Sequence, residues 1–245
     1  MSGHSKWNNI KRKKEKTDAQ KAKIFTKVGR EIAVAVKAGG ADPAVNGKLR
    51  DLIAKAKSLN VPNDNIQRII KKAEGAEKDD YESITYEGYG PSGIAMMVET
   101  LTDNRNRTAG NLRHYFDKFG GNLGNNGCVS FLFTEQGVIV LDVEDKDEET
   151  VMEDAFDAGA DDFDMADGVA EVTTSPEAFS EVRQALEEKG YEFISADVAM
   201  VPSTRTALTN PDDLKKMGLL LDHLEEDDDV QNIWHNLENE EDLDR

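Results

Sequence analysis

Cysteine and long apolar runs are both scarce in this 245-residue chain. The single cysteine, Cys128, excludes an internal disulfide and a cysteine-ligated metal cluster. It lies in the apolar run 128–133, where a small buried core residue is expected rather than a nucleophile. No segment has the roughly 18 apolar residues that a membrane span needs, and the N-terminus lacks the apolar stretch of a signal peptide. These absences predict a soluble protein of a reducing compartment.

Basic residues are also in short supply, and they are unevenly distributed. The chain has 30 Lys and Arg against 49 Asp and Glu, a formal net charge of −19. Residues 1–75 hold 18 basic and 7 acidic residues, whereas the remainder holds 12 basic and 42 acidic residues. Such asymmetry within one chain indicates a basic region that binds a polyanion. The acidic remainder is expected to limit non-specific binding and to favour solubility.

Motifs for catalysis or metal binding are missing. In the segment 40–48, six residues separate the two glycines where a P-loop has four, and Leu49 follows where Ser or Thr is needed. The segment 162–168 resembles a calcium loop, but its spacing is off by one and Thr173 replaces the ligating Glu. We interpret it as a solvated acidic turn. The four histidines lack metal-ligand spacing. We therefore expect a non-enzymatic protein with no metal and no cofactor.

The first third of the chain predicts a small helical bundle behind a basic arm. Residues 1–16 lack apolar periodicity, so we expect an arm that is mobile until it meets its partner. A first helix is predicted from Thr17 to Gly39 by an apolar stripe at spacings of three and four. A third helix is predicted from 60–63 to Gly75. Asp42-Pro43 predicts the start of the second helix, with inward residues Val45, Leu49, Leu52, Ile53 and Ala56.

The remainder predicts an α+β fold in two parts. The expected strands are 81–89, 94–101, 128–133, 137–143, 168–174, 191–201 and 230–234, and the expected helices are 105–119, 148–158, 176–188 and 210–226. The set before residue 134 lacks enough cover, so the last helix and strand are expected to return to it. The predicted fold class is α+β multidomain. A three-helix domain (1–76) is followed by two α+β domains of ferredoxin-like type, 77–134 plus 204–245 and the inserted 135–203.

The basic arm and first helix form the main candidate site. Lysine and arginine bind phosphates through counterion release, and Trp7 is suited to stacking on an unpaired base. The alternative is a solvated lysine-rich tail with Trp7 packed against the bundle. The dense, one-sided excess of positive charge favours nucleic acid. The candidate nucleic-acid-binding residues are Lys6, Trp7, Lys11, Arg12, Lys13, Lys14, Lys16, Lys21, Lys23, Lys27 and Arg30.

Two further charged features have open interpretations. Asn104, Arg105 and Arg107 lie at a predicted strand-to-helix junction, where backbone N–H groups favour anions. They form a second candidate anion site, and plain helix capping with exposed arginines is an equal alternative. The acidic runs 225–229 and 238–244 are interpreted as solubilising. Their alternative role is as a partner for the basic arm, either within the chain or in another protein.

Several motifs together resemble the YebC family, which includes the mitochondrial translational activator of cytochrome oxidase I. They are 3–10 (GHSKWNNI), 25–32 (FTKVGREI), 61–66 (VPNDNI), 86–91 (YEGYGP) and 102–108 (TDNRNRT). The resemblance covers essentially the whole chain. It implies three domains with the third inserted into the second. Because the chain opens directly on the family motif, it is expected to be a bacterial cytoplasmic member.

The resemblance also implies a regulator of gene expression. Family members carry the label of DNA-binding transcriptional regulators, which makes promoter DNA the leading target. The alternative is a ribosome-associated translation factor that binds ribosomal RNA or tRNA and relieves stalling at proline-rich stretches. No convincing helix-turn-helix recognition helix is seen in the sequence, and an arm carrying Trp7 suits RNA. A protein-interaction module remains a further alternative. No membrane partner is expected, and the oligomeric state is left open.

Overall fold

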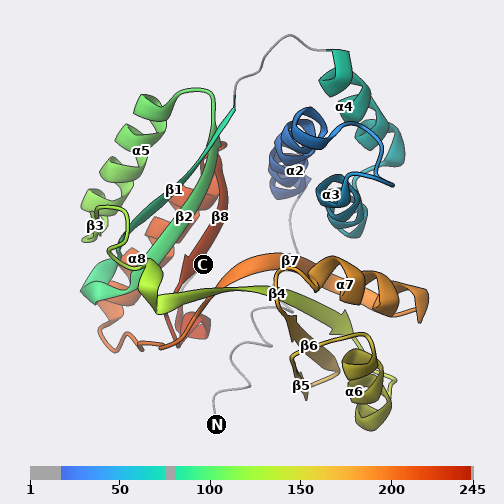
Figure 1. The fold of residues 1–245 in the computed structure, drawn as a ribbon. Coiled ribbons are helices and arrows are strands. Elements are labelled where there is room, and N and C mark those ends of the chain that lie inside the picture. Colours follow the sequence, from blue (N-terminus) through green and yellow to red (C-terminus); the bar gives the residue numbers. More distant parts are fainter. Residues whose placement is uncertain (1–17, 76–80, 244–245) are drawn as a thin grey trace.

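The computed structural model describes residues 18–75 and 81–243, with side chains from residue 23 onward. The fold is mixed α+β, as the sequence predicts (Figure 1). A region of three helices is followed by two antiparallel sheets of four strands each. The predicted arm lies outside the described residues. No helix in the described part combines the length and apolar character that crossing a membrane requires.

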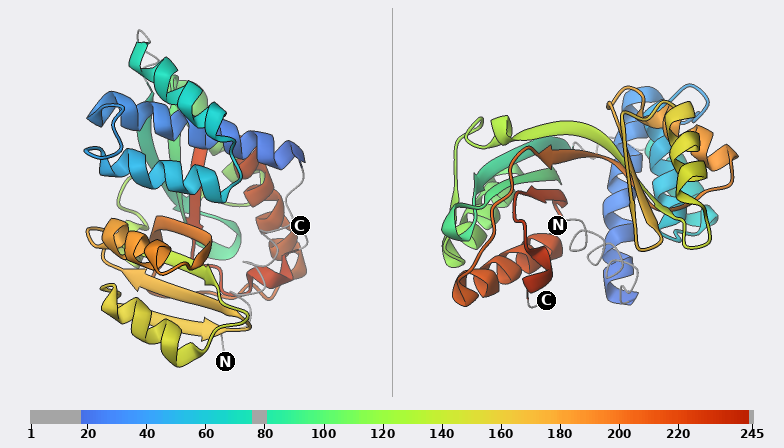
Figure 2. Two further views of the ribbon diagram at one scale, coloured as in Figure 1. Left: turned by 90° about the vertical axis from the view of Figure 1, so that its right-hand side faces the viewer. Right: turned by 90° about the horizontal axis from the view of Figure 1, so that it is seen from below.

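The helical region consists of α2 (Asp18–Gly39), α3 (Gly47–Ser58) and α4 (Asn63–Gly75). Their apolar stripes meet in one core, because residues three and four apart share a helix face. α2 contacts both α3 and α4, and α4 lies on the outer side of the region (Figures 1 and 2). The buried residues of this core include Ile32, Leu49, Ala56, Ile66 and Ile70.

The predicted start of the second helix at Asp42-Pro43 is wrong. Asp42 instead nucleates a turn, because its carboxylate accepts from the Ala44 amide at 2.9 Å and its carbonyl accepts from the Asn46 amide at 3.0 Å. Asn46 is the N-cap, and its Oδ1 accepts from the Leu49 amide at 3.1 Å. Val45 therefore precedes the helix and is 79% exposed rather than inward. A side-chain oxygen at the N-cap outweighs the Pro signal here.

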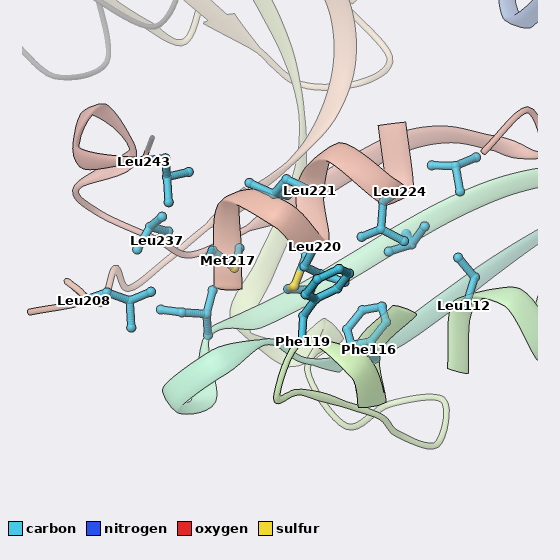
Figure 3. Packing of buried hydrophobic residues seen from close by; sticks show 14 residues of the cluster. Leu112, Phe116, Phe119, Leu208, Met217, Leu220, Leu221, Leu224, Leu237 and Leu243 are labelled. Atoms are coloured by element: carbon cyan, nitrogen blue, oxygen red, sulfur yellow. The ribbon is translucent and has the colours of Figure 1, made fainter. Parts of the chain in front are cut away.

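The first sheet has the strand order β3-β1-β2-β8. Its strands are β1 (Glu82–Tyr89), β2 (Ala95–Thr102), β3 (Asn122–Leu123) and β8 (Val230–His235). β8 pairs antiparallel with β2, which confirms that the C-terminal strand returns to the sheet. The helices α5 (Arg105–Lys118) and α8 (Pro211–Glu226) supply its apolar cover. In Figure 3, Phe116 and Phe119 lie against Leu220 of α8.

The second sheet has the order β5-β6-β4-β7. Its strands are β4 (Phe133–Asp142), β5 (Asp162–Ala166), β6 (Val169–Thr174) and β7 (Glu192–Pro202). The helices α6 (Glu148–Asp157) and α7 (Phe179–Glu188) pack against it around Ile139, Leu141 and Val172. The long strands β4 and β7 span the molecule from the first sheet towards the helical region (Figures 1 and 2).

The predicted strand 128–133 is also wrong. Residues 130–132 form a 3-10 turn, and the strand begins only at Phe133. The cause is the buried carboxylate of Glu87, which accepts from the amides of Gly127, Val129 and Ser130 at 2.7, 2.9 and 2.9 Å. These bonds hold the backbone in a loop, and Phe131 is 73% exposed as a result.

The segment interpreted as a solvated acidic turn contains a strand. β5 pairs with β6 along its whole length, and only Asp167-Gly168 turns. Both residues have positive φ, 51° and 75°, as a two-residue hairpin turn requires. Two 3-10 turns, Pro91–Gly93 and Glu240–Asp242, complete the described elements. The exact domain boundaries of the chain stay a prediction.

Candidate nucleic-acid interface

The basic face of α2 carries Lys23, Lys27 and Arg30, at the spacings of four and three that align side chains on one helix face. In the structure this face contacts the end of α8 (Figure 2). The Nζ atoms of Lys23 and Lys27 donate to the carbonyls of Glu226 and Glu225 at 3.3 and 2.9 Å. These cations are therefore directed at the last turn of α8, whose carbonyls lack helical partners.

Arg30 continues the same contact beyond the end of α8. Its Nη1 donates to the Asp228 carbonyl at 2.8 Å and to Asp229 Oδ1 at 3.1 Å. The guanidinium also lies 5.3 Å from the centre of the Tyr81 ring. The interpretation of 225–229 as a solubilising run is thus incomplete, because this run is also an intramolecular partner of the first helix.

Asp229 is a buried carboxylate on which several donors converge. Its Oδ2 accepts from Arg107 Nη2 at 2.7 Å, from Thr108 Oγ1 at 2.8 Å and from Thr102 Oγ1 at 3.2 Å, while its Oδ1 accepts from Arg30. Burial alone would raise the pKa of Asp229, but the hydrogen bonds from Arg107, Thr108 and Arg30 hold it below its usual value. The carboxylate joins the helical region to the first sheet.

Lys27 is partly buried at this contact. Burial lowers the pKa of its ammonium group, and the nearby carboxylates of Glu225, Asp227 and Asp228 oppose this effect only in part. At the contact with α8, the nearby carboxylates therefore do not fully offset the cost of burying the positive charge of Lys27.

The second candidate site gathers at the start of α5, as predicted. Asn104 caps the helix, with its Oδ1 accepting from the Arg107 amide at 3.1 Å. Arg107 also donates to Asp103 Oδ1 at 2.8 Å, in addition to its bond with Asp229. The exposed Arg105 lies 3.5 Å from Glu82. Both arginines thus already pair with carboxylates, and Asn104 caps the helix, which agrees with the capping alternative. An anion site here stays a prediction.

A third group of cations was missed in the sequence. Arg68, Lys71 and Lys72 are exposed on α4, on the side away from the buried Ile66 and Ile70. Within the described residues, no ion pair to a carboxylate is seen for any of them, and Arg68 reaches only the Asn65 side chain, at 3.4 Å. The signal was available, since the three positions share one face at spacings of three and four.

The remaining predicted residues cannot be placed. Lys21 belongs to α2, but its side chain lies outside the described part. The same holds for the whole arm, and these residues stay predictions: Lys6, Trp7, Lys11, Arg12, Lys13, Lys14 and Lys16.

A cleft of about 680 Å³ lies where the helical region meets both sheets. Its wall includes the carboxylates of Glu31, Asp51, Glu99, Glu135 and Asp197 against the cations Lys48, Arg50 and Lys55. Lys55 bridges Glu31 and Asp197 at 3.2 and 3.0 Å. Excess carboxylate disfavours phosphate, so the cleft is a poor backbone-binding groove. Among the described residues, no group of three or more His, Cys, Asp or Glu side chains is placed to hold a metal ion.

Comparison with known proteins identifies the family of this chain. A family model described as "TACO1/YebC protein N-terminal domain" matches residues 5–76, and one described as "TACO1/YebC second and third domain" matches residues 81–237. The chain belongs to the TACO1/YebC family. The boundary between the two TACO1/YebC models falls between α4 and β1.

Relatives within the TACO1/YebC family match over almost their full length. A protein of Acetivibrio thermocellus is 59% identical over 96% of this chain and 98% of its own. One of Ruminiclostridium cellulolyticum is 60% identical over 98% of both chains. Each is named "Probable transcriptional regulatory protein". The crystal structure of a conserved hypothetical protein from Aquifex aeolicus matches with a TM-score of 0.82 and 42% identity, covering 91% of this chain and 92% of that one.

Proposed function

We propose that this chain is a non-enzymatic regulator of gene expression that acts in transcription by binding DNA. The observation that carries the proposal is the exposed row Arg68, Lys71 and Lys72 on α4, within the one basic region of an acidic chain. Cations of this kind bind the phosphate backbone. The names of the relatives support a role in transcription.

The connection between α3 and α4 supports DNA as the target. Only residues 59–62 separate the two helices. Helix-turn-helix proteins use a turn of about three to four residues and place the second helix in the major groove. α4 presents Gln67 and Arg68 to solvent, and these side-chain types read base edges. The acidic remainder repels phosphate and would restrict contact to the helical region.

Neutralising the exposed row on α4 tests the proposal. We expect the combined change Arg68→Ala, Lys71→Ala and Lys72→Ala to weaken duplex binding. The slope of log K against log salt should fall by about 0.9 for each phosphate contact that is lost. Fluorescence anisotropy of a labelled duplex, titrated at several salt concentrations, measures both quantities.

A matched variant separates this site from a general charge effect. Arg113→Ala, Lys215→Ala and Lys216→Ala remove one arginine and two lysines from exposed positions on α5 and α8. This control should bind with a slope close to that of the parent chain. Equal losses in both variants would contradict the assignment to α4.

Translation is the rival function, and sedimentation distinguishes it. A DNA-binding regulator should remain in the free fractions of a sucrose gradient of cell lysate and should give sequence-selective footprints on DNA. Salt-sensitive co-sedimentation with ribosomes, without selective footprints, would replace the DNA proposal with ribosomal RNA as the target.

A further inference from the structure

The contact between α2 and the end of α8 resembles the way cations hold a polyanion. Three consecutive cations of one helix face, Lys23, Lys27 and Arg30, each donate to an oxygen of the acidic segment 225–229. The acceptors are carbonyls in and just beyond the last helical turn, where the helix dipole is negative. The side chains of the segment, Glu-Glu-Asp-Asp-Asp, add further negative charge.

The junction is polar rather than apolar. The core of the helical region contains residues of α2, α3, α4 and their connections, and the core of the first sheet contains none of these. The two are joined by polar contacts from the donors of α2, including the pair between Arg30 and the carboxylate of Asp229. The exposed contacts of Lys23 and Lys27 are weakened by salt and by competing ions, whereas the pair between Arg30 and the buried Asp229 is screened much less.

We propose that the acidic segment 225–229 is an internal competitor for nucleic-acid phosphate at Lys23, Lys27 and Arg30. The helical region then binds phosphate through this face only after it separates from α8. This inference rests on the proposed function and adds the regulation of the same surface. The cations of α4 are exposed in the docked arrangement, so they make the first contact, and the α2 face adds its contacts after release.

With competition of this kind, the apparent affinity equals the affinity of the free face multiplied by the fraction of molecules in which that face is free. Any change that weakens docking without touching the cations must therefore raise affinity. Glu225, Glu226 and Asp228 are suitable for this purpose, because all three are exposed at the surface. Their neutral isosteres remove the negative charge that attracts the cations and leave the backbone carbonyls in place, so the variant tests the charge of the segment and not its fold. The release variant carries Glu225→Gln, Glu226→Gln and Asp228→Asn.

A control variant removes the same three charges elsewhere. Glu149→Gln, Glu153→Gln and Asp157→Asn are exposed positions on α6, which packs against the second sheet. It has the same net charge as the release variant. Any difference between the two therefore reports the position of the charges and not their number.

We expect the release variant to bind a labelled DNA duplex roughly 3- to 30-fold more tightly than the control variant at low salt. The gain should shrink as salt rises, because salt weakens the internal contact as well. Equal affinities in the two variants would overturn the competition and leave the proposed function intact. Failure of the parent chain and both variants to bind either DNA or ribosomal RNA would overturn both proposals.

A second measurement compares the effect of one substitution in two backgrounds, so that a general effect of the release substitutions on binding cancels. Lys27→Ala is introduced into the parent chain and into the release variant, with circular dichroism confirming folding of each. Competition predicts a smaller loss of affinity in the parent chain, where the negative charge of Glu225 attracts Lys27, than in the release variant, where that charge is absent. The same fold-loss in both backgrounds would show that Lys27 is not withheld, and would refute the inference.

Discussion

At the scale of single residues, one buried carboxylate organises the junction near the start of α5. Asp229 is 4% exposed and accepts hydrogen bonds from two arginines and two threonines. Hydrogen bonds to a charged group are stronger than neutral ones, and removing Asp229 takes an acceptor away from the buried hydroxyls of Thr102 and Thr108. The stability of this junction therefore depends on the ionised form of a single side chain.

Asp229→Ala should lower the free energy of unfolding by about 2–4 kcal/mol at neutral pH. The pKa of Asp229 is lowered in the folded chain, so its contribution is fully present above the unfolded value of about 3.9. It is lost as the pH falls through the folded value. Urea unfolding between neutral and strongly acidic pH measures this, and the variant should show a weaker dependence than the parent chain.

The neighbouring Asp228→Ala is the matched control. Asp228 is exposed and offers Arg30 its backbone carbonyl, which the substitution retains. Its effect on stability should stay within about 0.5 kcal/mol. A loss as large as that of Asp229→Ala would show that the charge of the segment, rather than the buried carboxylate, sustains the junction.

At the scale of elements, a side chain from one strand determines the shape of a distant loop. Glu87 on β1 accepts three backbone amides from the loop before β4. Burial would raise the pKa of Glu87, and these three amides more than compensate, so the pKa is lowered. The loop ends as a 3-10 turn instead of the expected strand because these amides are already bonded.

Glu87→Ala should release that loop. We expect a loss of about 1–3 kcal/mol in the free energy of unfolding, since one buried amide and two partly buried amides lose their acceptor. Hydrogen exchange at Gly127, Val129 and Ser130 should accelerate. Glu82→Ala at the exposed start of the same strand serves as the comparison, with a change of less than about 1 kcal/mol. Unchanged exchange at the three amides would contradict this account.

At the scale of the whole molecule, the helical region is attached to its neighbours by polar contacts on two sides. Asp229 joins it to the first sheet, and Lys55 of α3 joins it to Asp197 of β7 in the second. Burial disfavours the charge on Lys55, but Asp197 and Glu31 more than compensate and raise its pKa. An attachment of this chemistry permits the separation on which the proposed competition depends.

Lys55→Ala should weaken the second attachment. Two carboxylates, Glu31 and Asp197, would then face each other without a cation, and we expect a loss of about 1–2 kcal/mol in urea unfolding. Lys57→Ala on the same helix is exposed and should change stability by less than about 0.5 kcal/mol. Equal effects from the two substitutions would mean that the bridge contributes nothing.

The sequence by itself determined most of the helices and strands, because their signals are local. Apolar residues three and four apart identified α2 and α4, and apolar runs bounded by turn signals identified β1, β2, β4, β6, β7 and β8. The short strand β3 and the acidic strand β5 were missed. The charge contrast between the first third and the remainder is likewise a property of the sequence. Errors arose where two local signals competed, as at Asp42-Pro43 and Asn46, or where a distant group intervened, as Glu87 does for the loop before β4.

Only the tertiary structure decided which charges are available. Arg30, Thr102, Arg107 and Asp229 are separated by up to 199 residues, and no local pattern brings them together. The sequence does not distinguish the cations of α2 from those of α4. In the structure, those of α2 lie against the end of α8, whereas those of α4 are exposed. The physical reason is that hydrogen bonds and ion pairs depend on distance in space, which the order of residues does not specify.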